Sequence, residues 1–177
     1  VDVPTVEYPN KGAVTVYANA SGWYNITIDG YGSKVVTINT PVGVVANATW
    51  NIDLLALGEY KVNVTKVDGN PNFKADVAEA VLNVTKGNAE IFIKVYESYQ
   101  VLDNVTITVI VPYGTGWVNI TDGTDLLDTV QLVNYTANFT IEGVEKLGTH
   151  VIYVDLFDDP SFKNSLNQTN FEVTPIP

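Results

Sequence analysis

The chain repeats its own sequence after about 90 residues. Gly22-Trp23-Tyr24-Asn25-Ile26-Thr27 returns as Gly116-Trp117-Val118-Asn119-Ile120-Thr121. Leu57-Gly58-Glu59-Tyr60 returns as Leu147-Gly148-Thr149-His150, and segment 68–74 returns as 158–163. Solenoid repeats are ~20–50 residues long, whereas a unit of about 90 residues can bury a core of its own. The repetition therefore predicts two consecutive domains, residues 1–87 and 88–177.

Each repeat contains about seven short segments in which apolar and polar residues alternate, bounded by Gly, Pro, Asn or Asp. In the first repeat they lie near 3–8, 13–19, 23–29, 34–39, 44–52, 59–67 and 77–85. In the second they lie near 90–96, 104–111, 117–121, 126–132, 135–141, 149–157 and 167–174. This pattern predicts an all-β protein of two tandem immunoglobulin-like β-sandwiches, each of about seven strands.

The alternation also assigns faces to the segments. Tyr60 and Val62 share the face of segment 59–67 that is expected to be buried. In the second repeat His150 replaces Tyr60, so the single His of the chain is interpreted as a substituted core aromatic. Trp50 and Phe139 occupy one aligned position, and both are expected in the cores.

Composition excludes several classes of protein. The net charge is −11 and all 9 basic residues are Lys, which argues against a nucleic-acid partner. Cys is absent, so no disulfide holds either domain. No apolar run of about 18 residues occurs, so membrane insertion by this segment is not expected. Because the chain begins at Val1 without a leader, it is interpreted as a piece of a longer exported protein.

Only a few residues join the two repeats. Between the last predicted strand of one and the first of the next lies the segment 85–89. A joint of that length limits rotation, so an elongated, semi-rigid pair is expected.

The motif Asn-x-Ser/Thr, the acceptor for N-linked glycans, is about fourfold more frequent than chance placement would give. It occurs at ten positions: Asn19, Asn25, Asn47, Asn63, Asn83, Asn104, Asn119, Asn134, Asn138 and Asn167. One explanation is glycosylation of an exported protein. The other is patterning, because residues i and i+2 share the polar face of a strand. Both explanations place these side chains in solvent.

Trp23 and Trp117 open the third predicted strand of each repeat, each directly after a Gly. Side chains alternate between the two faces of a strand, and both Trp residues fall on the face opposite to the apolar residues that follow. Both should therefore point away from the core. An exposed Trp is a candidate contact for a sugar ring or a partner surface. The alternative is a structural cover over the strand.

The residues do not assemble a known catalytic arrangement. His150 is the only His, Cys is absent, and no Gly-rich phosphate loop or HExxH motif is present. The chain is therefore not expected to be an enzyme. Lys94 and Asn170 have the topology for an isopeptide cross-link, but the first repeat has no Lys on its first strand.

Two acidic loops are candidates for calcium binding. Asp122, Asp125 and Asp128 lie in one predicted hairpin, and Asp158 and Asp159 in a second loop. EF-hand spacing is absent. The first repeat has Gly30-Tyr31-Gly32-Ser33 and Asp68-Gly69 at the corresponding places, so a shared site is not supported. No metal or other cofactor is expected.

The order Gly-Trp-x-Asn-Ile-Thr, Leu-Gly-x-Tyr-x-Val and an Asp/Pro/Phe loop resembles the tandem bacterial-immunoglobulin-like repeats of adhesin-like surface proteins of archaea, notably methanogens. The resemblance covers both repeats and departs at His150, where the pattern has an aromatic. It implies a large extracellular, cell-surface protein with many repeats, which spaces or presents an element for attachment.

The leading hypothesis is thus a structural and adhesive repeat segment. Its partners would be other cell surfaces or glycans and neighbouring repeats of the same chain. The main alternative is a carbohydrate-binding module that uses Trp23 and Trp117. A lattice protein of the cell envelope and an accessory domain of a secreted enzyme are further alternatives.

Overall fold

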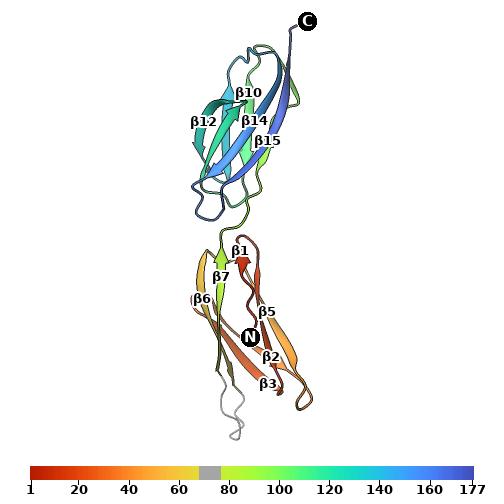
Figure 1. The fold of residues 1–177 in the computed structure, drawn as a ribbon, viewed down its shortest axis with the longest axis vertical. Helices are drawn as coiled ribbons and strands as arrows, with labels where there is room; N and C mark the ends of the chain where they lie inside the picture. The colour runs from red at the N-terminus through yellow and green to blue at the C-terminus, as the bar shows by residue number, and fades with distance from the viewer. Residues whose placement is uncertain (68–76) are drawn as a thin grey trace. The chain divides into compact units, whose positions relative to one another are not determined.

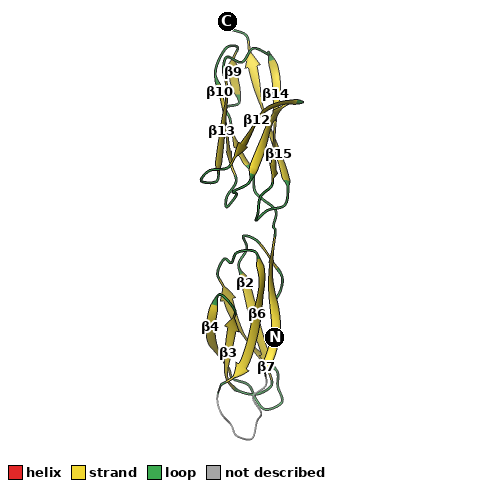
Figure 2. Ribbon diagram, turned by 90° about the vertical axis from the view of Figure 1, so that its left-hand side faces the viewer, coloured by secondary structure: helices red, strands yellow, loops and turns green. Residues whose placement is uncertain are grey.

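A computed structural model describes residues 1–67 and 77–177, and the first copy of the repeated segment 68–74 lies outside the described residues. The described residues form strands, turns and loops without any helix (Figures 1 and 2). They divide into two compact units, Val1–Thr85 and Lys86–Pro177. The all-β prediction is confirmed.

The described residues of the first unit, 1–67 and 77–85, form seven strands in two sheets. In chain order the strands are β1 (Val6–Glu7), β2 (Gly12–Ala18), β3 (Gly22–Ile28), β4 (Gly32–Ile38), β5 (Ala46–Ile52), β6 (Gly58–Lys66) and β7 (Val77–Thr85). One sheet has the order β1-β7-β6-β3-β4, and the other pairs β2 with β5.

The second unit contains eight strands. They are β8 (Phe92–Lys94), β9 (Ser98–Gln100), β10 (Val105–Ile110), β11 (Trp117–Asp122), β12 (Asp125–Gln131), β13 (Thr136–Ile141), β14 (Gly148–Phe157) and β15 (Ser165–Thr174). The five-stranded sheet has the order β12-β11-β14-β15-β9, and the other sheet has the order β13-β10-β8.

The two units share one topology. Reading β4-β3-β6-β7-β1 against β12-β11-β14-β15-β9 matches each strand with the strand about 90 residues later. The pair β2–β5 matches β10–β13 in the same way, and both are antiparallel. The sequence repeat is therefore a repeat of the whole sandwich.

The beginning of each unit differs from the single first strand that was predicted. In the second unit β8 pairs antiparallel with β10, and the chain then crosses to the other sheet, where β9 runs parallel to β15. In the first unit Asp2 bridges Thr15 of β2, and β1 then runs parallel to β7. Alternation predicts only that a segment is extended, so it could not reveal this change of partner.

Each core lies between the two sheets of its unit. Val14, Ile26, Ile28 and Val62 are almost fully buried in the first, and Val105, Ile107, Ile120 and Ile152 are among the fully buried residues of the second. These positions come from facing strands, so their side chains interdigitate as in a close-packed interior.

Two details differ from the sequence expectations. Trp50 and Phe139 are only half-buried, and Trp50 packs at the margin of the core with its ring 5.6 Å from that of Tyr31. The backbone of Gly87 hydrogen-bonds Ser161 and Lys163, so this residue belongs to the second unit.

Candidate functional site

The outward face of β3 carries Trp23, Asn25 and Thr27 in one row. The alternate residues of this strand are buried, whereas these three are exposed or half-buried. The Trp23 side chain is 56% exposed. This row follows from the two-residue period of a strand, which places residues i, i+2 and i+4 on one face.

The second unit builds the same row on β11 from Trp117, Asn119 and Thr121. Trp117 is 39% exposed. The hydroxyl of Thr129 on the neighbouring strand β12 donates a hydrogen bond of 2.6 Å to Oδ1 of Asn119. The amide of Asn119 is thus anchored through its oxygen.

Each Trp has an apolar neighbour beside it, Val67 directly after the end of β6 and Phe157 at the end of β14. The backbone N–H of Val67 donates to the carbonyl of Trp23 at 2.9 Å, which sets the two residues side by side. Trp117 is paired in register with Phe157 of β14. Each outward row therefore begins with a small apolar patch.

None of the ten Asn-x-Ser/Thr acceptors is buried. Six are exposed, namely Asn19, Asn47, Asn104, Asn134, Asn138 and Asn167. Four are half-buried, namely Asn25, Asn63, Asn83 and Asn119. All four half-buried ones lie within the five-stranded sheets, where neighbouring strands flank them.

The outward faces of the smaller sheets carry matching polar pairs. The hydroxyls of Thr15 and Thr49 are 2.9 Å apart, and those of Thr106 and Thr140 are 3.1 Å apart at the equivalent place. Asn138 accepts a hydrogen bond of 2.8 Å from the Thr108 hydroxyl. Part of the acceptor motif thus serves cross-strand pairing, as the patterning explanation requires.

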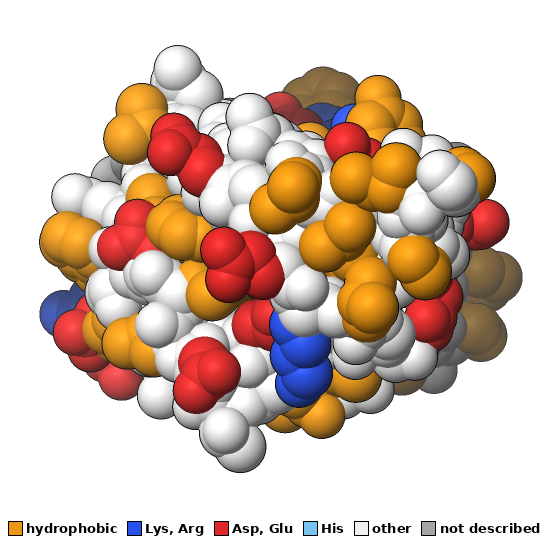
Figure 3. All heavy atoms as spheres, turned by 90° about the horizontal axis from the view of Figure 1, so that it is seen from above, with side chains coloured by type: hydrophobic (Ala, Val, Ile, Leu, Met, Phe, Trp, Pro, Cys, Tyr) orange, Lys and Arg blue, Asp and Glu red, His pale blue; other side chains and the backbone are white. Residues whose placement is uncertain are grey.

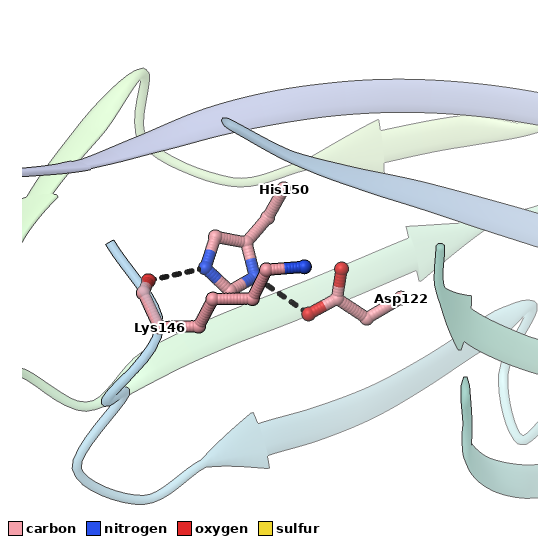
Figure 4. A network of polar contacts seen from close by, with 3 residues as sticks. All are labelled: Asp122, Lys146 and His150. Carbon is pink, nitrogen blue, oxygen red and sulfur yellow. Dashed lines mark hydrogen bonds and ion pairs between the residues drawn. The ribbon is translucent and has the colours of Figure 1, made fainter. Parts of the chain in front are cut away.

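His150 is a structural residue of the second core. Its side chain is 3% exposed, and its ring stacks on Phe171 with centroids 4.7 Å apart. Asp122 and the backbone of Lys146 lie on opposite sides of the ring (Figure 4). Nδ1 is 2.6 Å from Oδ2 of Asp122, and Nε2 donates to the Lys146 carbonyl at 2.7 Å.

The first unit shows which residue His150 replaces. The hydroxyl of Tyr60 donates to the carbonyl of Ala56, four residues earlier, at 2.7 Å. This is the arrangement called a tyrosine corner in immunoglobulin-like domains. His150 makes the same bond to the residue four positions earlier, so it is a substituted corner aromatic and not an isolated reactive group.

Asp159 is a buried carboxylate that holds two loops together. Its Oδ2 accepts from the backbone N–H groups of Thr115 and Gly116 at 2.9 and 2.8 Å. Its Oδ1 accepts from those of Ser161 and Phe162 at 2.8 and 3.2 Å. Four donors satisfy both oxygens, which is how a buried charge is stabilised without a counterion.

The acidic side chains that the structure describes do not form a cluster that could bind a cation. Asp122 is engaged with His150 and Asp159 with backbone donors. Over the described residues no group of three or more His, Cys, Asp or Glu is arranged to hold a metal ion. On the face shown in Figure 3, acidic side chains lie scattered among hydrophobic and uncharged ones.

The second unit also has an open groove that the sequence analysis did not single out. It lies where the first strand crosses between sheets and is lined by Ile93, Lys94, Val95, Tyr96, Tyr99, Thr106 and Thr108. Tyr96 is 78% exposed, and its ring centroid is 5.9 Å from that of Tyr99. Tyr99 is half-buried, and the change of sheet brings the two rings together, so alternation could not have found the pair.

Lys94 and Asn170 do not form an isopeptide pair. Lys94 lies on β8 and Asn170 on β15, in different sheets, and both side chains are exposed. The cross-link needs a buried lysine, which this position does not provide.

Comparison with known proteins gives fold relatives only. No known protein-family model matches the chain, and no curated protein matches its sequence. The structure is similar to that of a protein of Corynebacterium diphtheriae described as membrane-anchored, with a TM-score of 0.50 and 15% identity. That match covers 99% of this chain and 53% of the other, so the chain spans about half of that protein.

Two further matches are more distant. A central fibronectin-III array of RIM-binding protein matches 99% of this chain and 69% of its own, with a TM-score of 0.39 and 11% identity. The BSP domain of a biofilm-associated protein matches 99% of this chain and 30% of its own, with a TM-score of 0.35 and 12% identity.

The strand order and the corner hydrogen bonds define the class of both units. Each is an immunoglobulin-like β-sandwich, an architecture shared with fibronectin-III domains. Residues 1–67 and 77–177 contain no helix that is long and apolar enough to cross a membrane.

Proposed function

We propose that this chain is a tandem-repeat segment of a larger extracellular, cell-surface protein, which spaces or presents an element for attachment. The observation that carries the proposal is the duplication of the sandwich, because each of the seven described strands of the first unit has a counterpart in the second. Stalks grow by duplicating self-sufficient domains, because each copy adds length without depending on the others for its core.

Two further findings support a surface location. The structurally similar protein of Corynebacterium diphtheriae is described as membrane-anchored. The repeated Gly-Trp-x-Asn-Ile-Thr and Leu-Gly motifs resemble those of archaeal adhesin-like repeats. The partners proposed for such a segment are glycans or other cell surfaces, together with neighbouring repeats.

The segment itself is proposed to catalyse no reaction. Its single His is used in the core, and its buried Asp159 is used by four backbone donors. Both groups are therefore committed to stability rather than to chemistry.

A binding assay with the complete 177-residue chain tests the adhesive part of the proposal. The chain is coupled to beads through its C-terminus, and beads are counted on surfaces coated with purified glycans or cells. Retention above that of uncoated beads supports direct adhesion. No retention on any surface restricts the segment to spacing and removes the adhesive part.

The second candidate function is carbohydrate binding by the outward Trp side chains. It is favoured by the exposure of Trp23 and Trp117 beside Asn and Thr on the outward face of a sheet. Titration with oligosaccharides should then quench Trp fluorescence, and Trp23→Ala with Trp117→Ala should abolish retention of beads. Unchanged retention in the double variant excludes this function.

A further inference from the structure

Both exposed Trp residues precede a glycan-acceptor Asn by two positions. Trp23 precedes Asn25, and Trp117 precedes Asn119. The third Trp of the chain, Trp50, lies at the margin of the core and precedes no acceptor in this way. The two outward Trp side chains and two acceptors are thus paired by position.

The strands turn this spacing into proximity. On β3 and on β11 the Trp and the Asn share the outward face, and residues two apart on one strand are about 6.7 Å apart. A sugar on the Asn amide would stand on that face next to the indole ring. A pyranose ring presents C–H groups on one side, and these pack favourably against the electron-rich face of an aromatic ring.

We infer that Asn25 and Asn119 carry N-linked glycans whose first sugar packs against Trp23 and Trp117 of the same chain. The indole rings are then covers for an attached glycan and not platforms for a foreign one. The inference rests on the export that the proposed function implies, but it requires no adhesive partner.

The modification is a glycosyl transfer to the side-chain amide. Nδ2 forms a bond to the anomeric carbon of an oligosaccharide linked to a lipid diphosphate. The anomeric C–O bond breaks, the lipid diphosphate leaves, and the amide nitrogen gives up one proton. In the folded second unit the Asn119 amide is held through Oδ1 by Thr129, so this hydrogen bond does not use the nitrogen that would carry the sugar.

The other acceptors lack this arrangement. Asn19 has Tyr17 two residues before it, but β2 ends at Ala18, so the strand alternation does not extend to Asn19. The remaining seven have an aliphatic residue, Lys, Thr or Ser at that position. Asn63 is the closest control, because it is half-buried in the middle of the same sheet as Asn25 and has Lys61 in the place of Trp.

The first test is occupancy. The 177-residue chain is secreted from a eukaryotic host that attaches N-linked glycans, and glycopeptide mass spectrometry measures the occupancy of each of the ten acceptors. The inference predicts sugar on Asn25 and Asn119. Bare amides at both positions overturn it.

The second test is energetic coupling within one unit. The parent chain, Trp117→Ala, Asn119→Gln and the double variant are secreted from that host, and hydrogen-exchange mass spectrometry follows the second unit separately. The same four proteins from a bacterial host, without sugar, form the reference set. In the proteins that carry sugar, the coupling between Trp117 and Asn119 should change the unfolding equilibrium constant by about three- to tenfold more than in the proteins without sugar. Equal coupling in both sets overturns the inference.

A matched pair controls for general effects of the glycan. Lys61→Ala with Asn63→Gln in the first unit should show the same coupling with and without sugar, because the residue two positions before Asn63 is Lys61 and not an aromatic residue. The stability readouts involve no binding partner. If the sugar adds no coupling between Trp117 and Asn119 but the beads are still retained, the inference alone is refuted. If the sugar adds the coupling but the beads are not retained, only the adhesive part of the proposed function is refuted.

Discussion

Tyr60 and His150 occupy equivalent positions of the fold, although their side chains donate through different chemical groups. Tyr60 and His150 both donate to a carbonyl four residues earlier, through a hydroxyl in one unit and a ring nitrogen in the other. His150 has an additional partner in Asp122. The interpretation of His150 as a substituted core aromatic agrees with this geometry, whereas Asp122 could not be inferred because it lies on a different strand.

The corner bond predicts the effect of substitutions at this position. His150→Tyr should cost less than about 1 kcal/mol, because Tyr can restore the bond to the Lys146 carbonyl. His150→Phe keeps the ring but removes both polar contacts, and it should cost about 2 kcal/mol. Urea unfolding of the two variants measures the difference, and equal stability would show that the corner bond contributes nothing.

Asp159 predicts a larger effect. In Asp159→Asn one oxygen becomes an NH₂ group that cannot accept, so two backbone N–H donors lose their partner, at a cost of about 2–4 kcal/mol. Asp158→Asn is the control, because Asp158 is exposed with φ of 49°, a conformation that Asn tolerates. Thermal unfolding compares the two, and a cost below about 1 kcal/mol for Asp159→Asn would contradict the account.

At the scale of elements, most strands of each sandwich could be predicted from the sequence, but the change of sheet at the start of each unit could not. The prediction for 77–85 coincides with β7, because alternation and flanking polar residues define it well. The first strand of each unit changes sheets, and the sequence contains no periodic signal for a change of hydrogen-bond partner.

The same division applies to the candidate site. Strand parity places Trp23 and Trp117 on the outward faces. The contact of the exposed Tyr96 with the half-buried Tyr99 depends on the change of sheet, and the contacts of the Asp159 carboxylate depend on how two loops meet. Such contacts are tertiary, and a single sequence does not encode them in any local pattern.

The Gly before Trp117 has a structural reason at this scale. A Cβ at Gly116 would lie 2.8 Å from Cα of Asp159 and 2.8 Å from the carbonyl oxygen of Phe157. Both are backbone atoms, one at the end of β14 and one in the β14–β15 connection, and cannot move easily. Gly116→Ala should therefore destabilise the second unit by about 1–3 kcal/mol.

Thr115→Ala is the matched control for this prediction, because the Thr115 side chain is exposed and should change stability by less than about 0.5 kcal/mol. Calorimetry on the two variants provides the comparison. If both variants unfold at the temperature of the parent chain, the close approach of β11 to the β14–β15 connection is wrong.

At the scale of the whole molecule, the account depends on two sandwiches that each have their own core. Among the described residues of the first unit, the buried ones that form its core all belong to strands β1 to β7. The hydrogen bonds of Gly87 lie within the second unit. In a spacer made of such units, each domain unfolds separately under force, and the others stay folded.

Stretching single molecules of the 177-residue chain between two surfaces tests this claim most directly. The account predicts two separate unfolding events, each releasing roughly 30 nm of chain, because each unit contributes about 90 residues of ~3.4 Å. Mutation of Gly116 to Ala should lower the force of one event only. A single event that releases the length of both units together would contradict the claim that the chain is a series of independent domains.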